Sequence, residues 1–89
     1  MGRIAAEMER KLTAALAPSR LELTDDSARH AGHAHGGEES HFTLMVESTA
    51  FAGLGRMERQ RIVMRVLAEE LAGPVHALSI RAVAPGEKA

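Results

Sequence analysis

The stretch from residue 40 to residue 47 reads Ser-His-Phe-Thr-Leu-Met-Val-Glu and alternates between polar and apolar side chains. Successive side chains of a strand point to opposite faces of the sheet. Phe42, Leu44 and Val46 therefore share one face, and the opposite face carries His41, Thr43, Met45 and Glu47. The pattern predicts a strand over 40–47 with one buried face.

A second strand is predicted at residues 20–25, where Leu21 and Leu23 alternate with polar residues. Residues 27–39 lie between the two strands and contain three glycines, which favours a flexible loop. A hairpin is the simplest pairing of two strands that flank one loop. The loop is longer than a tight hairpin needs, and loops of this length often carry function.

Two longer segments have helical spacing. The segment 3–17 has apolar residues four apart, which places them on one stripe, and Pro18 ends it. These are Ile4, Met8, Leu12 and Leu16. The segment 56–72 has a second stripe and ends at Gly73-Pro74. That stripe consists of Ile62, Val63, Val66, Leu67 and Leu71.

The remaining segments complete a single domain. Residues 48–53 predict one short helical turn, with Ser or Thr as its N-cap and Gly at its end. Residues 75–83 predict a third strand, with Leu78 and Ile80 on one face. The expected order is α-β-β-α-α-β, an α+β domain whose three-stranded sheet is covered by helices on one face and open on the other. We expect one domain over residues 1–84 and a flexible tail over 85–89.

Composition excludes several classes of function. The 89 residues contain no cysteine, so disulfides and thiolate chemistry are excluded, and a metal bound by this chain alone must use His, Asp or Glu. Two aromatic residues and a net charge of -1 disfavour a stacking platform or a broadly basic surface for nucleic acid. No apolar run is long enough for a membrane span, and the N-terminus lacks the apolar core of a secretory signal, so a cytoplasmic location is expected.

Six fragments, in order along residues 4–83, together resemble the BolA family. They are Asp25-Asp26-Ser27 followed by His30; Glu39-Ser40-His41-Phe42; Phe51-Ala52-Gly53; Arg59-Gln60-Arg61; Leu67-Ala68-Glu69-Glu70-Leu71; and Val75-His76-Ala77-Leu78-Ser79-Ile80. Each fragment alone is a weak signal, and the six in register make a specific match. The chain departs from the family pattern at Gln60, where a His is usual, and in the extra histidines of its loop.

The resemblance implies a class II KH-like fold and a partnership with a monothiol glutaredoxin. In that heterodimer a [2Fe-2S] cluster is shared: the glutaredoxin and glutathione give sulfur ligands, and the BolA-like protein gives histidine from its third strand and its hairpin loop. Such proteins act in iron–sulfur homeostasis and stress response. A second role of some members is DNA binding and transcriptional regulation.

The histidines have both structural and ligand interpretations. By alternation His76 shares a face with Leu78 and Ile80, so from the residues alone it is a half-buried structural residue. The resemblance instead makes His76 the cluster ligand. His30 best matches the family's loop ligand, His33 is the runner-up, and His35 is an accessory candidate. His41 is interpreted as a surface or interface residue.

A basic segment precedes and opens the long helix. Gly53 and Gly55 flank a compact turn, followed by four arginines near the start of the helix: Arg56, Arg59, Arg61 and Arg65. Three interpretations remain open. The segment 49–65 is a helix-turn-helix that offers arginines to phosphate, a site for the carboxylates of a docked partner, or a solvated helix face.

We therefore predict a non-enzymatic protein. The chain has no phosphate-binding glycine loop, no HExxH and no nucleophile elbow. The first hypothesis is a glutaredoxin partner that uses His76 and a loop histidine as cluster ligands. The isolated chain is not expected to hold a cluster. The rival is a DNA-binding regulator. A third hypothesis is a stand-alone zinc or copper binder that uses the loop histidines.

Overall fold

A computed structural model describes residues 2–26 and 40–88. In chain order the elements are α1 (Arg3–Leu16), β1 (Arg20–Asp25), β2 (His41–Glu47), the 3-10 turn η2 (Thr49–Phe51), α2 (Arg56–Val66), α3 (Ala68–Ala72) and β3 (Ala77–Val83). This is the predicted α-β-β-α-α-β order, and the α+β class is confirmed.

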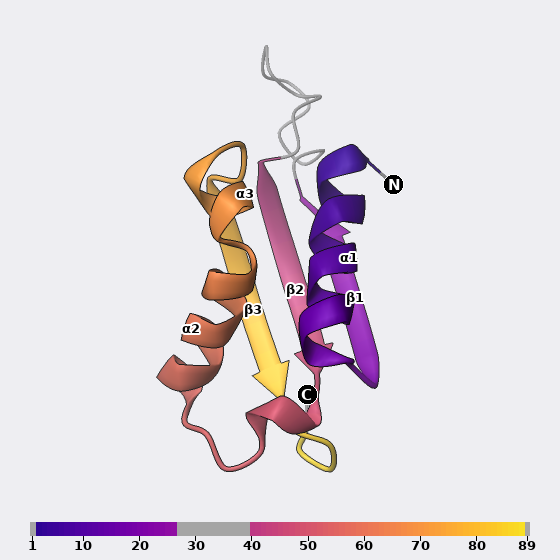
Figure 1. Cartoon of the computed structure of the whole chain (residues 1–89), viewed down its shortest axis with the longest axis vertical. Coiled ribbons are helices and arrows are strands. Elements are labelled where there is room, and N and C mark those ends of the chain that lie inside the picture. The colour runs from indigo at the N-terminus through magenta and orange to yellow at the C-terminus, as the bar shows by residue number, and fades with distance from the viewer. Residues whose placement is uncertain (1, 27–39, 89) are drawn as a thin grey trace.

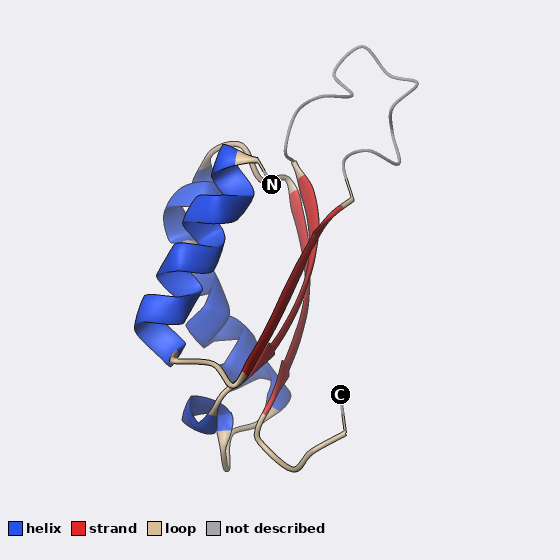
Figure 2. Cartoon of the chain, turned by 90° about the vertical axis from the view of Figure 1, so that its right-hand side faces the viewer, coloured by secondary structure: helices blue, strands red, loops and turns tan. Residues whose placement is uncertain are grey.

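The described strands form one mixed sheet in the order β1-β2-β3. β1 pairs with β2 antiparallel, which confirms the hairpin, and β2 pairs with β3 parallel with His41 opposite Ala77. β2 and β3 therefore begin at the same end of the sheet (Figure 1). The helices all lie on one side of the sheet, so its other face is open, as predicted (Figure 2).

The core lies between the helices and the inner face of the sheet. β2 contributes Phe42, Leu44 and Val46, which are all buried, as the alternation predicts. The stripe of α1 buries Met8 and Leu12 completely. From the other elements the core takes Leu16, Phe51, Val63, Leu67 and Val75. A small domain buries a smaller share of its surface than a large one and is correspondingly less stable. Each of these buried side chains therefore matters for stability.

Several element boundaries differ from the predictions, and β2 begins at His41 instead of residue 40. α1 ends at Leu16 because Ala17 is left-handed, with φ 43°, and its N–H bonds to Thr13 O. The helix predicted over 56–72 is divided at Leu67, whose φ of -104° and ψ of 22° are not helical. Hydrogen bonds continue across the division, from Leu67 N to Val63 O and from Leu71 N to Leu67 O. The third strand begins at Ala77 instead of residue 75.

Ser48 joins three elements at the end of the sheet opposite His41. It is 1% exposed, its Oγ donates to Leu16 O at 2.7 Å, and the same Oγ accepts from Ala50 N at 3.1 Å. Its own N–H bonds to Val83 O. Ser48 therefore caps η2, as its position predicted, and fixes that turn to α1 and β3. No helix in residues 2–26 and 40–88 is long and apolar enough to cross a membrane.

Candidate functional site

His76 lies just before β3, at the end of the sheet where β2 also begins. The prediction that His76 is partly buried is wrong, because the residue is exposed. It lies one position before the first residue of the strand. The backbone is nonetheless fixed, because Ser40 O accepts from both His76 N, at 2.8 Å, and Ala77 N, at 3.1 Å.

His41 is the nearest described histidine to His76. It is the first residue of β2, and the centroids of the two imidazole rings are 6.5 Å apart with the rings tilted by 32°. The Ser40 hydroxyl is 2.9 Å from His41 Nδ1. The Ser40 side chain thus bonds to the His41 ring, and the Ser40 carbonyl oxygen accepts from the backbone N–H of His76. From the sequence, His41 was predicted to be a surface or interface residue and not a ligand.

The loop candidates His30, His33 and His35 lie outside the described residues. The residues that flank their segment are described. Asp26 N donates to His41 O at 2.7 Å, and Ser40 is bonded to His76 as above. Asp26 and Ser40, the described residues on either side of 27–39, are therefore attached to the sheet beside His41 and His76.

Arg59 lies far from the histidines, between the start of α2 and the end of β3. Its guanidinium binds the carboxylate of Glu87 through two bonds of 2.6 and 2.9 Å. It also donates to the carbonyl oxygens of Leu54, at 2.9 Å, and Ala82, at 3.1 Å. Glu87 further accepts from Ala84 N at 2.9 Å, so the segment expected as a flexible tail is held at this residue. The Arg59 guanidinium, followed by the Ala84 N–H, lowers the pKa of Glu87 to about 2.

A cavity of about 460 Å³ lies beside Arg59. Arg56 and Gln60 line it from α2, and Arg81 lines it from β3. Arg61 and Arg65 are exposed and do not line it. The four predicted arginines are thus not one cluster: Arg59 is engaged within the chain, Arg56 faces the cavity, and the other two face solvent.

The two glycines of the basic segment have different roles. Gly53 has φ 77°, a left-handed conformation that L side chains rarely adopt. Gly55 is the N-cap of α2, and its N–H donates to the Glu58 carboxylate at 3.3 Å. Together they shape the turn into α2, and neither shows a ligand-binding role by itself.

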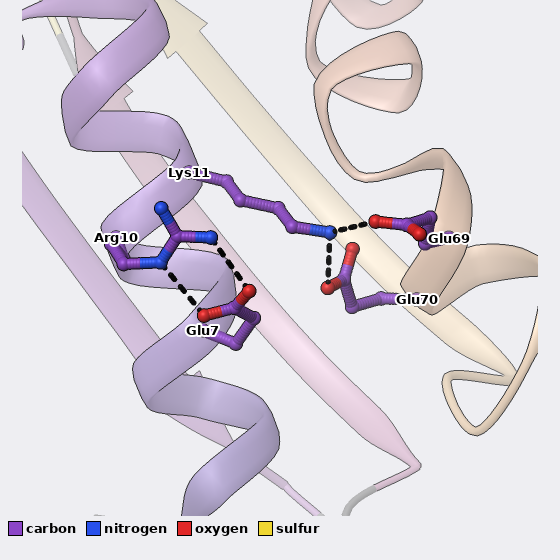
Figure 3. Close-up of polar contacts among 5 residues, drawn as sticks. All are labelled: Glu7, Arg10, Lys11, Glu69 and Glu70. Carbon is purple, nitrogen blue, oxygen red and sulfur yellow. Dashed lines mark hydrogen bonds and ion pairs between the residues drawn. The ribbon is translucent and has the colours of Figure 1, made fainter.

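A second polar cluster joins α1 to α3 (Figure 3). Lys11 Nζ lies 2.6 Å from Glu69 Oε1 and 2.8 Å from Glu70 Oε2, and these contacts raise the pKa of Lys11, the Glu69 bond more than the Glu70 bond. Glu70 is 8% exposed, and its Oε1 has no hydrogen-bond partner among the described residues. Beside it, Arg10 and Glu7 form an exposed pair on α1. The cluster links two helices that cover the sheet.

Sequence reasoning missed three residues of these sites. His41 was present in the alternating pattern, but only the parallel register of β2 and β3 brings it to His76. Arg81 lines the cavity from a strand far along the chain, and Glu87 lies in a segment with no regular pattern. No regular spacing in the sequence predicts the contacts of these three residues.

Comparison with known proteins gives a consistent result. The family model described as BolA-like protein matches residues 12–87. BolA-like protein 1 of Mus musculus is 45% identical over 86 residues, and the DNA-binding transcriptional regulator BolA of Escherichia coli is 42% identical over 77 residues. These matches cover 97% and 86% of this chain, and 61% and 71% of the two relatives. The chain thus spans about three fifths of the length of the mouse protein.

Among solved structures, the BolA domain of SufE1 from Arabidopsis thaliana superposes with a TM-score of 0.89. It is 39% identical in sequence, and the match covers 99% of both chains. The similarity therefore extends over the whole sheet and its covering helices.

Proposed function

Because the chain belongs to the BolA-like family, we propose that it acts as a non-enzymatic partner of a monothiol glutaredoxin and contributes histidine to a shared [2Fe-2S] cluster. His76 is the ligand on the described part of the chain, and a histidine of the segment 27–39, His30 before His33, is the second. The glutaredoxin and glutathione supply the sulfur ligands. The proposed role is in iron–sulfur homeostasis.

The position of His76 carries the proposal. Its side chain is exposed at one end of the sheet, while two hydrogen bonds to Ser40 O fix the backbone of residues 76 and 77. An exposed ring on a fixed backbone suits a cluster that a second protein brings, because the partner can approach without a rearrangement of the core. Asp26 and Ser40, which flank the histidine-bearing segment, are attached next to it.

The donor set fits the cluster. Neutral imidazole ligates iron, and in Rieske centres two histidines replace two thiolates on one iron and raise the reduction potential. When bound, the cluster would supply electron-transfer and iron–sulfur chemistry. The chain's own residues would hold the ligand rings in place and present a protein surface to the partner.

The test is a titration of a cluster-loaded monothiol glutaredoxin with this protein, followed by visible absorption and circular dichroism. We expect a spectral change that saturates at one-to-one and is lost in His76→Ala. Ser79→Ala, an exposed change on β3, is the control and should behave as the unaltered protein. A spectrum that does not change with added protein would contradict the proposal.

A second candidate function is DNA binding by the segment 49–65, because the Escherichia coli relative is a DNA-binding transcriptional regulator. Arg56, Arg61 and Arg65 are the exposed cations of that segment. Phosphate-driven binding weakens steeply as salt rises, by counterion release. Binding of duplex DNA that falls with salt and is reduced by Arg61→Gln and Arg65→Gln together would support this candidate. Binding that these changes leave unaltered would exclude it for this segment.

A further inference from the structure

The described part of the chain brings two histidine rings together at one end of the sheet, one at the start of β2 and one just before β3. We infer that His41 and His76 together form a two-imidazole site for a divalent first-row transition metal ion, independent of any glutaredoxin. The inference shares His76 with the proposed function. Its test contains no glutaredoxin and no cluster, so the two can fail separately.

The backbone places the two rings together. His41 is opposite Ala77 in the parallel register, and Ser40 O bonds to the N–H of both His76 and Ala77. The Cα positions of both histidines are therefore set by the sheet. Only side-chain torsions remain to be adjusted when a ligand binds, which lowers the entropic cost of assembling the site.

The separation of the rings fits one shared metal ion. A metal ion lies about 2.0–2.1 Å from an imidazole nitrogen, which puts it roughly 3 Å from the ring centroid. Two rings that share one ion thus have centroids at most about 6–7 Å apart on the same bond length. The observed 6.5 Å is at the limit of this range, which is reached only when the two nitrogens lie on opposite sides of the ion. For a smaller nitrogen–metal–nitrogen angle the exposed His76 ring has to turn toward His41 when the ion binds.

Ser40 gives His41 the outer partner that a ligating histidine needs. Metal-bound imidazole usually donates its other N–H to a nearby acceptor, which fixes the tautomer and the ring orientation. In the tautomer whose Nδ1–H donates to the Ser40 hydroxyl, at 2.9 Å, the lone pair of His41 is on Nε2. Nε2 is then the ligand atom of this histidine.

The donor set selects the class of metal. Imidazole nitrogens suit Zn²⁺, Cu²⁺ and Ni²⁺ rather than Mg²⁺ or Ca²⁺, and Cu²⁺ binds most tightly in the Irving–Williams order. In residues 2–26 and 40–88 no group of three or more His, Cys, Asp or Glu is arranged to hold a metal ion. The described chain therefore supplies two ligands, and Cu²⁺ in its tetragonal geometry accepts two imidazoles with water at its other positions.

The experiment removes the competing histidines first. The full chain carrying His30→Ala, His33→Ala and His35→Ala retains His41 and His76 as its remaining histidines, since the sequence has five. Cu²⁺ alone is titrated into this protein by calorimetry, and electron spin-echo measurements on the bound Cu²⁺ count its imidazole ligands. We expect one equivalent of Cu²⁺ with two imidazoles. His41→Gln and His76→Gln should each weaken binding at least tenfold and leave one imidazole.

Ser40→Ala tests the outer partner, and we expect Cu²⁺ binding about 10–100-fold weaker, the usual loss for such a residue. Ser79→Ala is the matched control and should leave the affinity unchanged. Far-UV circular dichroism confirms that each variant folds. Binding that is unaffected by His41→Gln, or Cu²⁺ held by one imidazole before that change, would overturn the inference and leave the two rings as a packing contact.

Discussion

At the scale of a single residue, the buried hydroxyl of Ser48 shows how one polar atom holds several elements together. Ser48→Ala leaves Leu16 O without its donor and removes the cap of Ala50 N. An unsatisfied buried acceptor costs about 1–3 kcal/mol. We expect the free energy of unfolding in urea to fall by that amount.

The matched control for this prediction is Ser79→Ala. It is the same chemical change on the exposed face of β3, and surface changes of this kind usually stay within about 0.5 kcal/mol. If Ser48→Ala and Ser79→Ala lower the free energy of unfolding equally, the hydrogen bonds of the Ser48 hydroxyl do not contribute to stability.

At the scale of elements, Glu87 attaches the C-terminal segment to α2 and β3 through Arg59. The pKa of Glu87 is about 2 in the folded protein, below its usual 4.5, because the carboxylate accepts from Arg59 and Ala84 N. A carboxyl group with a lowered pKa stabilises the folded state above its unfolded pKa, and this contribution is lost as pH falls through the folded pKa. The stabilisation is therefore complete above about pH 4.5 and disappears toward pH 2.

The measurement compares the free energy of unfolding of the unaltered protein with that of Glu87→Gln as pH is lowered. We expect the difference between the two to shrink from pH 4.5 to pH 2. Glu9→Gln is the control, since Glu9 forms no ion pair with another described residue of the chain. A difference that stays constant over this range would contradict the assigned ion pair.

The contact between α1 and α3 gives a second prediction at this scale. Lys11→Met leaves the buried Glu70 carboxylate without its cation, which is more destabilising than the removal of both charges. We therefore expect Lys11→Met to lower the melting temperature more than the double change Lys11→Met with Glu70→Met. Glu70→Met alone is measured as well. If the double change lowers the melting temperature by at least the sum of the two single changes, Lys11 and Glu70 are not coupled.

At the scale of the whole molecule, short-range patterns predicted the sheet and the helices. Alternation in 40–47 and the stripe of Met8 and Leu12 follow from burial of one face, which is a local property of the sequence. The division at Leu67 was not predicted, because leucine is a good helix former and the pattern continues through it. The pairing of His41 with His76 depends on the parallel register of two strands that are far apart in sequence, and no spacing encodes that register.

Three side chains lie opposite one another across β1, β2 and β3 on the inner face of the sheet: Leu23, Leu44 and Ile80. Leu44 is in the central strand and 0% exposed, whereas Leu23 is in an edge strand and half-buried. Leu44→Ala should lower the free energy of unfolding by about 2–5 kcal/mol, since it leaves a cavity in the core. Leu23→Ala removes the same atoms where solvent and side-chain movement can fill the space, so we expect a clearly smaller loss. Both are measured by urea unfolding, and a loss for Leu23→Ala as large as that for Leu44→Ala would mean that the core does not centre on β2. Because domains are stable by only about 5–15 kcal/mol in total, a loss of about 2–5 kcal/mol at Leu44 would identify the inner face of β2 as a main support of the fold.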